Sequence, residues 1–138
     1  MPNRMSAALI LTLGSLLAPP VQDKQIEPPA LISPVEYAVL DNGCQNRTNG
    51  IEWDFKWTDV PAARLYHLYV VGPQAKYPVI NNAEITYAAY QDIRAESYII
   101  ESNRRGWRWK VRALVGNEWS EWSEERTFDV EAMNTDCP

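Results

Sequence analysis

A strict alternation of apolar and charged side chains, with a period of two residues, constrains this chain more than any other feature. In Ile51–Trp57, four apolar side chains alternate with two acids and one lysine. Trp107–Leu114 repeats the pattern, with basic residues between the apolar ones. Because successive side chains of a strand point to opposite faces of a sheet, both segments are predicted to be half-buried antiparallel strands.

Similar short segments, separated by turn residues, occur throughout residues 30–130, and none of them has a helical period. Leu65–Val71 places Tyr66, Leu68 and Val70 on one face, and Ser97–Glu101 is expected to do the same with its alternate residues, Tyr98 and Ile100. The other candidate strands are Ala30–Ile32, Tyr77–Ile80, Ile85–Tyr87 and Arg126–Val130. About seven short strands in about a hundred residues predict an all-β fold, a two-sheet antiparallel β-sandwich of the immunoglobulin-like class.

The first 20 residues are predicted to be a secretory signal peptide. They contain one charged residue, Arg4, and an apolar stretch, Ala7–Leu17, that ends before Ala18 and two prolines. This stretch is shorter than the roughly 20 residues that span a bilayer, so no stable membrane span is expected and the chain is predicted to be secreted or periplasmic. A leader that is uncleaved or cut elsewhere, or a buried N-terminal helix, is the alternative. The predicted organisation is a linker at 21–29, the domain at 30–131 and a tail at 132–138.

Composition excludes several classes of function. With 13 basic and 18 acidic side chains, the formal charge is −5, which argues against nucleic acid as a partner. One histidine and two cysteines are too few for a zinc cage, and no metal or cofactor is expected. The histidine, His67, is predicted to be a sheet-surface residue on the same face as Tyr69 rather than a general base. The chain is therefore not expected to be an enzyme.

Over residues 30–130 the chain resembles a fibronectin type III domain of the secreted bacterial type. The segments that resemble strands A, B and C of that family are Leu31–Pro34, Phe55–Trp57 with the following Val60–Ala63, and Tyr66–Val70. Trp109–Ala113 resembles strand F, whose first position is ordinarily a tyrosine, so the presence of Trp109 puts the tyrosine-corner hydrogen bond of the family in doubt. The resemblance implies a non-catalytic module that mediates contacts or spaces other domains.

The segment Trp119–Ser123 matches the Trp-Ser-any-Trp-Ser (WSXWS) motif of class I cytokine receptors, whose domains are themselves of the fibronectin type III kind. In that family the tryptophan rings interleave with basic side chains of strand F. Basic side chains at a spacing of two lie about 7 Å apart along a strand, which suits cations placed between rings. The resemblance therefore predicts a mainly structural ladder. Its members would be Arg108, Lys110, Arg112, Trp119 and Trp122.

The two cysteines of an exported chain are predicted to form a disulfide bond. Cys44 lies in the first long connection and Cys137 lies beyond the last strand, places that fall at the same end of a seven-strand sandwich of this type. Two free thiols are the alternative. In the same connection Asn46 begins an Asn-Arg-Thr triplet, a candidate glycosylation site.

The end of the sandwich opposite the predicted disulfide is the candidate partner-binding region. It should carry the Val115–Glu118 loop and the Asp59–Arg64 connection, and the candidate contact residues are Asn117, Arg64 and an exposed Trp119. The predicted function is a non-catalytic exported module for protein–protein or cell-surface contacts. One alternative is carbohydrate binding, if several rings form an exposed strip. The tyrosines available for it are Tyr66, Tyr69, Tyr77, Tyr87, Tyr90 and Tyr98. The other alternative is a structural spacer without a ligand.

Overall fold

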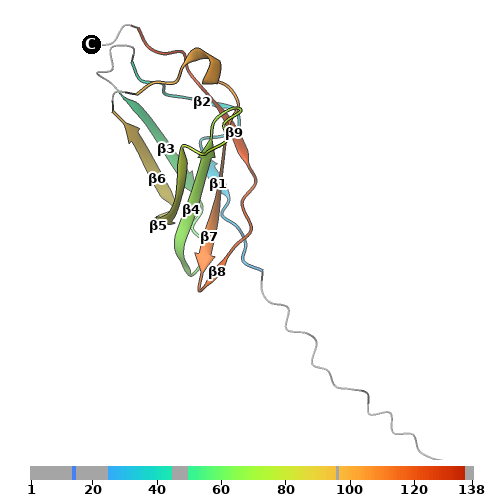
Figure 1. The fold of residues 1–138 in the computed structure, drawn as a ribbon. Coiled ribbons are helices and arrows are strands. Elements are labelled where there is room, and N and C mark those ends of the chain that lie inside the picture. The colour runs from blue at the N-terminus through green and yellow to red at the C-terminus, as the bar shows by residue number, and fades with distance from the viewer. Residues whose placement is uncertain (1–13, 15–24, 45–49, 96, 136–138) are drawn as a thin grey trace, which may run out of the picture.

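The computed structural model describes residues 14, 25–44, 50–95 and 97–135, and in it two β-sheets face each other across one apolar core (Figure 1). The strands are β1 (Leu31–Ser33), β2 (Ala38–Leu40), β3 (Ile51–Trp57), β4 (Ala63–Val71), β5 (Ile80–Ile85), β6 (Ala89–Arg94), β7 (Trp107–Val115), β8 (Glu118–Trp119) and β9 (Arg126–Val130), and one 3-10 helix, η1, spans Glu101–Asn103. One sheet has the order β1-β3-β6, and the other has the order β2-β9-β7-β4-β5 with β8 paired to β7. The predicted two-sheet β-sandwich is confirmed.

The segments with the strongest alternation form the strands that were predicted for them. Ile51–Trp57 and Arg126–Val130 match β3 and β9, while β4 and β7 extend slightly beyond the predicted ranges. The remaining pairs of neighbouring strands are antiparallel, but β2 runs parallel to β9, with Ala38 opposite Phe128. This short edge strand departs from the fully antiparallel arrangement that was expected.

Three predicted strands are wrong or displaced. Residues 97–100 form no strand, and Ile99 rather than Tyr98 or Ile100 packs against the core. Of Tyr77–Ile80, only Ile80 belongs to a strand, because β5 begins there. The range Ile85–Tyr87 is the end of β5 and the turn that follows it.

The prediction missed β6 because charged side chains occupy two of its three inward-facing positions, and the third is Tyr90. Asp92 and Arg94 form an ion pair at 2.8 Å, and both are largely buried at the edge of the three-stranded sheet. The Arg94 Nη2 also donates to the carbonyl of Val79 at 3.0 Å, which joins this edge to the segment before β5. Charges that point inward on an edge strand discourage pairing with another chain, and they also hide the apolar alternation.

Aromatic rings from the two sheets interlock in the core. The Trp53 ring lies 5.2 Å from that of Trp107 and 5.3 Å from that of Phe128, and the Phe55 ring lies 5.1 Å from that of Trp109, all in edge-to-face arrangements. Such pairs add about 0.5–1.5 kcal/mol each beyond the burial of their area. The inward phases predicted for β3 and β7 are therefore confirmed. The Nε1 of Trp109 is buried without a hydrogen-bond partner in the described part of the chain, so this position makes no corner bond through its ring.

The fully buried side-chain amide of Asn42 bonds to the backbone of the segment Ser97–Glu101, where a strand was predicted. Its Nδ2 donates to the carbonyl oxygens of Ile99 at 3.0 Å and Glu131 at 2.9 Å, and its Oδ1 accepts from the backbone N–H of Ile99 at 2.5 Å. Because these backbone groups are satisfied by a side chain, the segment needs no neighbouring strand. Asn42 thereby ties together the first connection, the segment before η1 and the end of β9.

We expect Asn42→Ala to lower the free energy of unfolding by about 2–4 kcal/mol, because it leaves three backbone groups in a largely buried site without partners. Urea denaturation measures the change. The control is Asn103→Ala, whose exposed side chain has no hydrogen bond to another described residue, and it should stay within about 0.5 kcal/mol of the parent. Equal stability of the two variants would contradict the role assigned to the buried amide.

Candidate functional site

The WSEWS segment, Trp119–Ser123, completes the open edge of β7. On one side β7 pairs with β4 along its whole length, but on the other side β9 reaches only Trp107–Trp109. Farther along, Ser120 exchanges two hydrogen bonds with Ala113, its N–H donating to the carbonyl at 2.8 Å and its Oγ accepting from the N–H at 2.9 Å. Ser123 makes the same pair with Val111, at 2.8 and 3.0 Å. The two buried serines therefore take the place of a strand.

Cations and rings alternate on the outer surface of this strand pair, and we call the set Trp119, Arg112, Trp122, Lys110 and Tyr69 the ring ladder. The guanidinium of Arg112 lies 4.7 Å from the ring centre of Trp119 and 4.6 Å from that of Trp122. The Lys110 Nζ lies 4.6 Å from the Trp122 ring and 5.3 Å from the Tyr69 ring. Each contact contributes about 0.5–1 kcal/mol at an exposed site, so the ladder stiffens this face without replacing the core.

Four of the five residues that were expected in the ladder come together in this way. Arg108, the fifth, is directed to Glu125, with its Nη1 3.6 Å from Oε1. Tyr69 is the fifth member of the observed ladder, and the prediction did not include it. Its contact with Lys110 follows from the register, because Tyr69 lies directly opposite Lys110 across the β4–β7 pair.

His67 lies under the ladder, and the sequence reasoning missed this role. It shares a sheet face with Tyr69, as predicted, since both rings contact Trp122. The expected place on the open surface is wrong, because Trp119 and Trp122 cover the imidazole and leave it only 9% exposed. Burial lowers the pKa of His67, with smaller lowering effects of Arg112 and Lys110 and an opposing effect of the hydrogen bond to Asn81. Its place opposite Arg112 in the register of β4 and β7 produces this contact, and local periodicity in the sequence gives no signal of that register.

Two connections meet at one end of the sandwich, which we call the turn end: residues 60–64 and 116–119. Arg64 joins them, since its Nε and Nη2 donate to the carbonyl of Gly116 at 2.9 and 2.8 Å. Gly116 has φ +60° at the first position of the two-residue β7–β8 loop, a conformation that favours glycine there. In the other connection, Ala62 has φ 62°, a conformation that costs a residue with a side chain some strain.

The structure places the three candidate contact residues at this end in different situations. Asn117 is exposed at the tip of the β7–β8 loop. Arg64 is exposed but engaged with the loop backbone, so it positions the loop. Trp119 is half-buried rather than exposed, because its ring packs against Arg112 and His67.

The segment that follows β2 and contains Cys44 lies at the opposite end of the molecule from β8 (Figure 1). Cys44 is 1% exposed, is not a free thiol, and forms a parallel bridge with Asn134. The Asn134 side chain also donates to the carbonyl of Gly43 at 3.0 Å. Cys137 and Asn46 lie outside the described residues, so the Cys44–Cys137 pairing and the glycosylation site remain predictions. The bridge between Cys44 and Asn134 supports the pairing, because Asn134 lies three residues before Cys137 in the sequence.

We expect no free thiol in the denatured, unreduced protein. In the chain-entropy account, a bond between Cys44 and Cys137 would stabilise the fold by about 4–5 kcal/mol, less any strain, so reduction should lower the midpoint of urea unfolding. Thiol titration before and after reduction checks both statements. Two thiols per chain before reduction would exclude the pairing.

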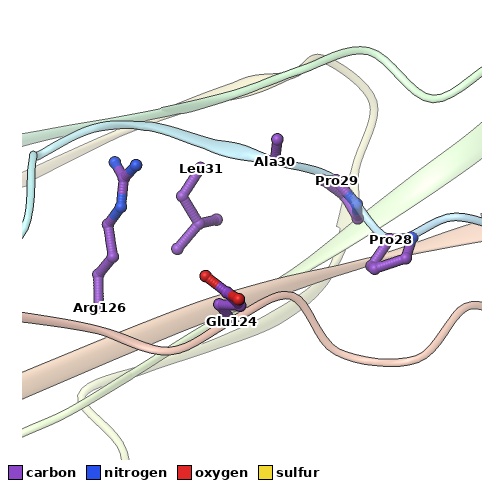
Figure 2. A pocket seen from close by; sticks show the side chains of 6 residues that line it. All are labelled: Pro28, Pro29, Ala30, Leu31, Glu124 and Arg126. Atoms are coloured by element: carbon purple, nitrogen blue, oxygen red, sulfur yellow. The ribbon is translucent and has the colours of Figure 1, made fainter.

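A shallow depression of about 290 Å³ lies where the described chain enters the sandwich (Figure 2). Its lining residues are Pro28, Pro29, Ala30, Leu31, Glu124 and Arg126. The Nη1 of Arg126 donates to the carbonyls of Ile32 and Pro34, both at 3.0 Å. These carbonyls belong to β1 and to the residue that follows it, and β1 pairs on one side only with a strand of the described chain, so the side chain of Arg126 covers this edge. None of the predicted contact residues lines this depression.

The tyrosines considered for carbohydrate binding form no common strip. Tyr66 is buried, and Tyr69 belongs to the ladder. Tyr77 and Tyr87 are 72% and 79% exposed, but they belong to the connections at opposite ends of β5. In the described ranges of the chain, no group of three or more acidic, histidine or cysteine side chains is arranged to hold a metal ion, and no helix is long and apolar enough to cross a membrane.

No protein-family model matches the chain, and no curated protein sequence matches it either. Among solved structures, the chain is similar to "a Fn3-like protein from Clostridium thermocellum", with 15% identity and a TM-score of 0.47 over 79% of this chain and 97% of that chain. The assignment of the fold class here rests on the two sheets themselves.

We expect Ser123→Ala to lower the free energy of unfolding by about 1–3 kcal/mol, because the buried N–H of Val111 loses its acceptor. Glu121→Ala, which truncates the exposed middle residue of the motif, should change it by no more than about 0.5 kcal/mol. Chemical denaturation compares the two. If Glu121→Ala were as harmful as Ser123→Ala, the serine bonds would not be what completes the edge of β7.

Proposed function

We propose that this chain is an exported, non-catalytic β-sandwich module that contacts a protein or cell-surface partner through its turn end. The main support for this proposal is the double hydrogen bond from Arg64 to the Gly116 carbonyl. It joins two connections from different parts of the sequence into one surface. Loops held on a rigid sheet are common recognition surfaces, because little conformational entropy is lost when they bind. Beside them, Trp119 offers a half-buried ring whose orientation is already fixed by Arg112.

The absence of a catalytic role is supported by the state of the single histidine. Both ring nitrogens of His67 are engaged, one with Arg112 and the other with Asn81, so neither faces a substrate. The fibronectin type III resemblance of the sequence also implies a module that mediates contacts. Export remains part of the proposal, and the predicted signal peptide at residues 1–20 supports it.

Carbohydrate binding is disfavoured by the packing of the rings. A sugar stacks on the free face of an aromatic ring, but the Trp122 ring has Arg112 and Lys110 both at 4.6 Å. The spacer alternative has one observation in its favour. The chain enters β1 from the end of the sandwich that carries β8, and the segment that follows β9 lies at the other end (Figure 1), which suits a module joined in series.

The test compares the full chain with Asn117→Arg and Ser102→Arg. Both substitutions add one positive charge at an exposed site, the first on the turn end and the second in η1 at the opposite end. Each immobilised protein is exposed to intact cells of its source and to the proteins extracted from their surface. We expect Asn117→Arg to reduce retention at least about tenfold, the effect of losing about 1.4 kcal/mol of binding free energy, with Ser102→Arg unchanged.

Equal retention by Asn117→Arg and the parent would place the contact elsewhere on the molecule. Binding of the parent to a glycan array, with no protein retained, would favour the carbohydrate alternative. Failure of the parent to retain anything would favour a spacer.

A further inference from the structure

We infer that His67, in its neutral form, is the positioning residue that holds Arg112 between the two tryptophans of the WSEWS segment, and that acid releases this hold. The inference concerns the ladder itself and is independent of whether the turn end binds a partner. It makes the outer surface of the β4–β7 pair sensitive to pH through one side chain.

The position of His67 follows from the strand register. His67 lies directly opposite Arg112 across the β4–β7 pair, on the face that carries the ladder. The Arg112 Nε donates to the His67 Nδ1 at 3.0 Å, while the guanidinium carbon lies 4.7 and 4.6 Å from the centres of the Trp119 and Trp122 rings. The imidazole itself lies 4.8 Å from the Trp122 ring centre. The hydrogen bond therefore holds the guanidinium at the position where it contacts both rings.

The hydrogen bonds require one tautomer of His67. An arginine has donors only, so the Nδ1 that faces Arg112 must be the acceptor, and the proton must be on Nε2. That proton points at the Oδ1 of Asn81 on β5, at 2.5 Å. Asn81 thus selects the tautomer that Arg112 needs, as a second group commonly does for a functional histidine.

Protonation of His67 would remove the acceptor. A proton on Nδ1 would face the N–H of Arg112, donor against donor, and would place a second positive charge beside the guanidinium in a largely buried site. Either the imidazole or Arg112 must then move. Among the described residues, the Arg112 side chain is held by its two ring contacts and this bond, so its departure from between Trp119 and Trp122 is the expected response.

The charged groups around His67 act in the same direction. Burial is the main cause of the lowered pKa of His67, and Arg112 and Lys110 on β7 lower it further. From β5, Asn81 is the one contact that raises it. The exposed carboxylates on the elements packed against it, Glu84 on β5, Glu118 on β8 and Glu121 in the following segment, are not among the groups that shift it.

The sign of the pH dependence follows from this lowered pKa. The unfolded chain takes up the proton near the ordinary value of 6.5, before the folded chain does. The stability contributed by neutral His67 is therefore fully present above that value and is lost as the pH falls through it toward the folded pKa. Per pH unit below the ordinary value, the folded-to-unfolded ratio falls by up to about tenfold, until the folded imidazole is itself protonated.

The first measurement uses the unaltered full chain. His67 is the only histidine, so one imidazole signal in the proton NMR spectrum reports its titration without assignment. We expect its pKa in the folded protein to lie below the value measured in urea. The near-ultraviolet circular dichroism of the tryptophans should change with the same midpoint. A folded pKa equal to or above the unfolded one would overturn the inference.

Two variants separate positioning from simple burial. His67→Asn keeps an acceptor near the place of Nδ1 and cannot titrate, so it should keep the tryptophan signal at pH 7.5 and lose the acid transition. His67→Gln places its amide near the position of Nε2, where it can donate to Asn81, but puts no acceptor at the position of Nδ1, so it should show the acid-type tryptophan signal already at pH 7.5. An acid transition in His67→Asn with the parent's midpoint, or a parent-like signal in His67→Gln, would overturn the inference. The titration of the parent remains decisive if either variant fails to fold.

Discussion

The backbone of β7 is the constraint on which the rest of this structure depends. This central strand needs hydrogen-bond partners on both edges, and β9 supplies them only for Trp107–Trp109. β8 pairs with the far end of β7, at Leu114 and Val115. Between these two stretches the hydroxyl and amide groups of Ser120 and Ser123 bond to Ala113 and Val111, and each hydroxyl also donates to the carbonyl of the following residue. Because the buried backbone groups of Val111 and Ala113 are satisfied in this way, the chain can leave the sheet after β8 and return to it at β9 without leaving these groups unpaired.

The outer surface follows from this arrangement. The two serines fix the backbone of the segment, and their tryptophan neighbours are thereby placed over the basic side chains of β7. One of those side chains, Arg112, is in turn oriented by His67 from the neighbouring strand. The turn end continues the same surface, since Trp119 closes the ladder and β8 begins just after the loop that Arg64 holds. A binding module with a rigid surface is the function that this sequence of contacts supports.

Much of the fold could be predicted, because half-buried strands give an alternation that a single sequence reveals. The prediction failed where another interaction replaced that signal. At β6 the inward positions carry the Asp92–Arg94 ion pair, and at 97–100 the Asn42 amide satisfies the backbone without a strand. The site was predicted in part. The WSEWS motif indicated the ladder, but the contacts of Tyr69 and His67 depend on a register between distant strands, which local periodicity does not contain.

The sequence by itself determined the inner and outer faces of β3, β4, β7 and β9, because the period of two assigns each side chain to a face whatever the neighbouring strand is. It also determined that cations and tryptophans would lie on one outer surface. Only the tertiary structure decided which of them meet: Arg108 pairs with Glu125, while Arg112 lies between two rings and against His67. The reason is physical. A face is a property of one strand, whereas a contact requires the register of two strands and the path of the segment that crosses them.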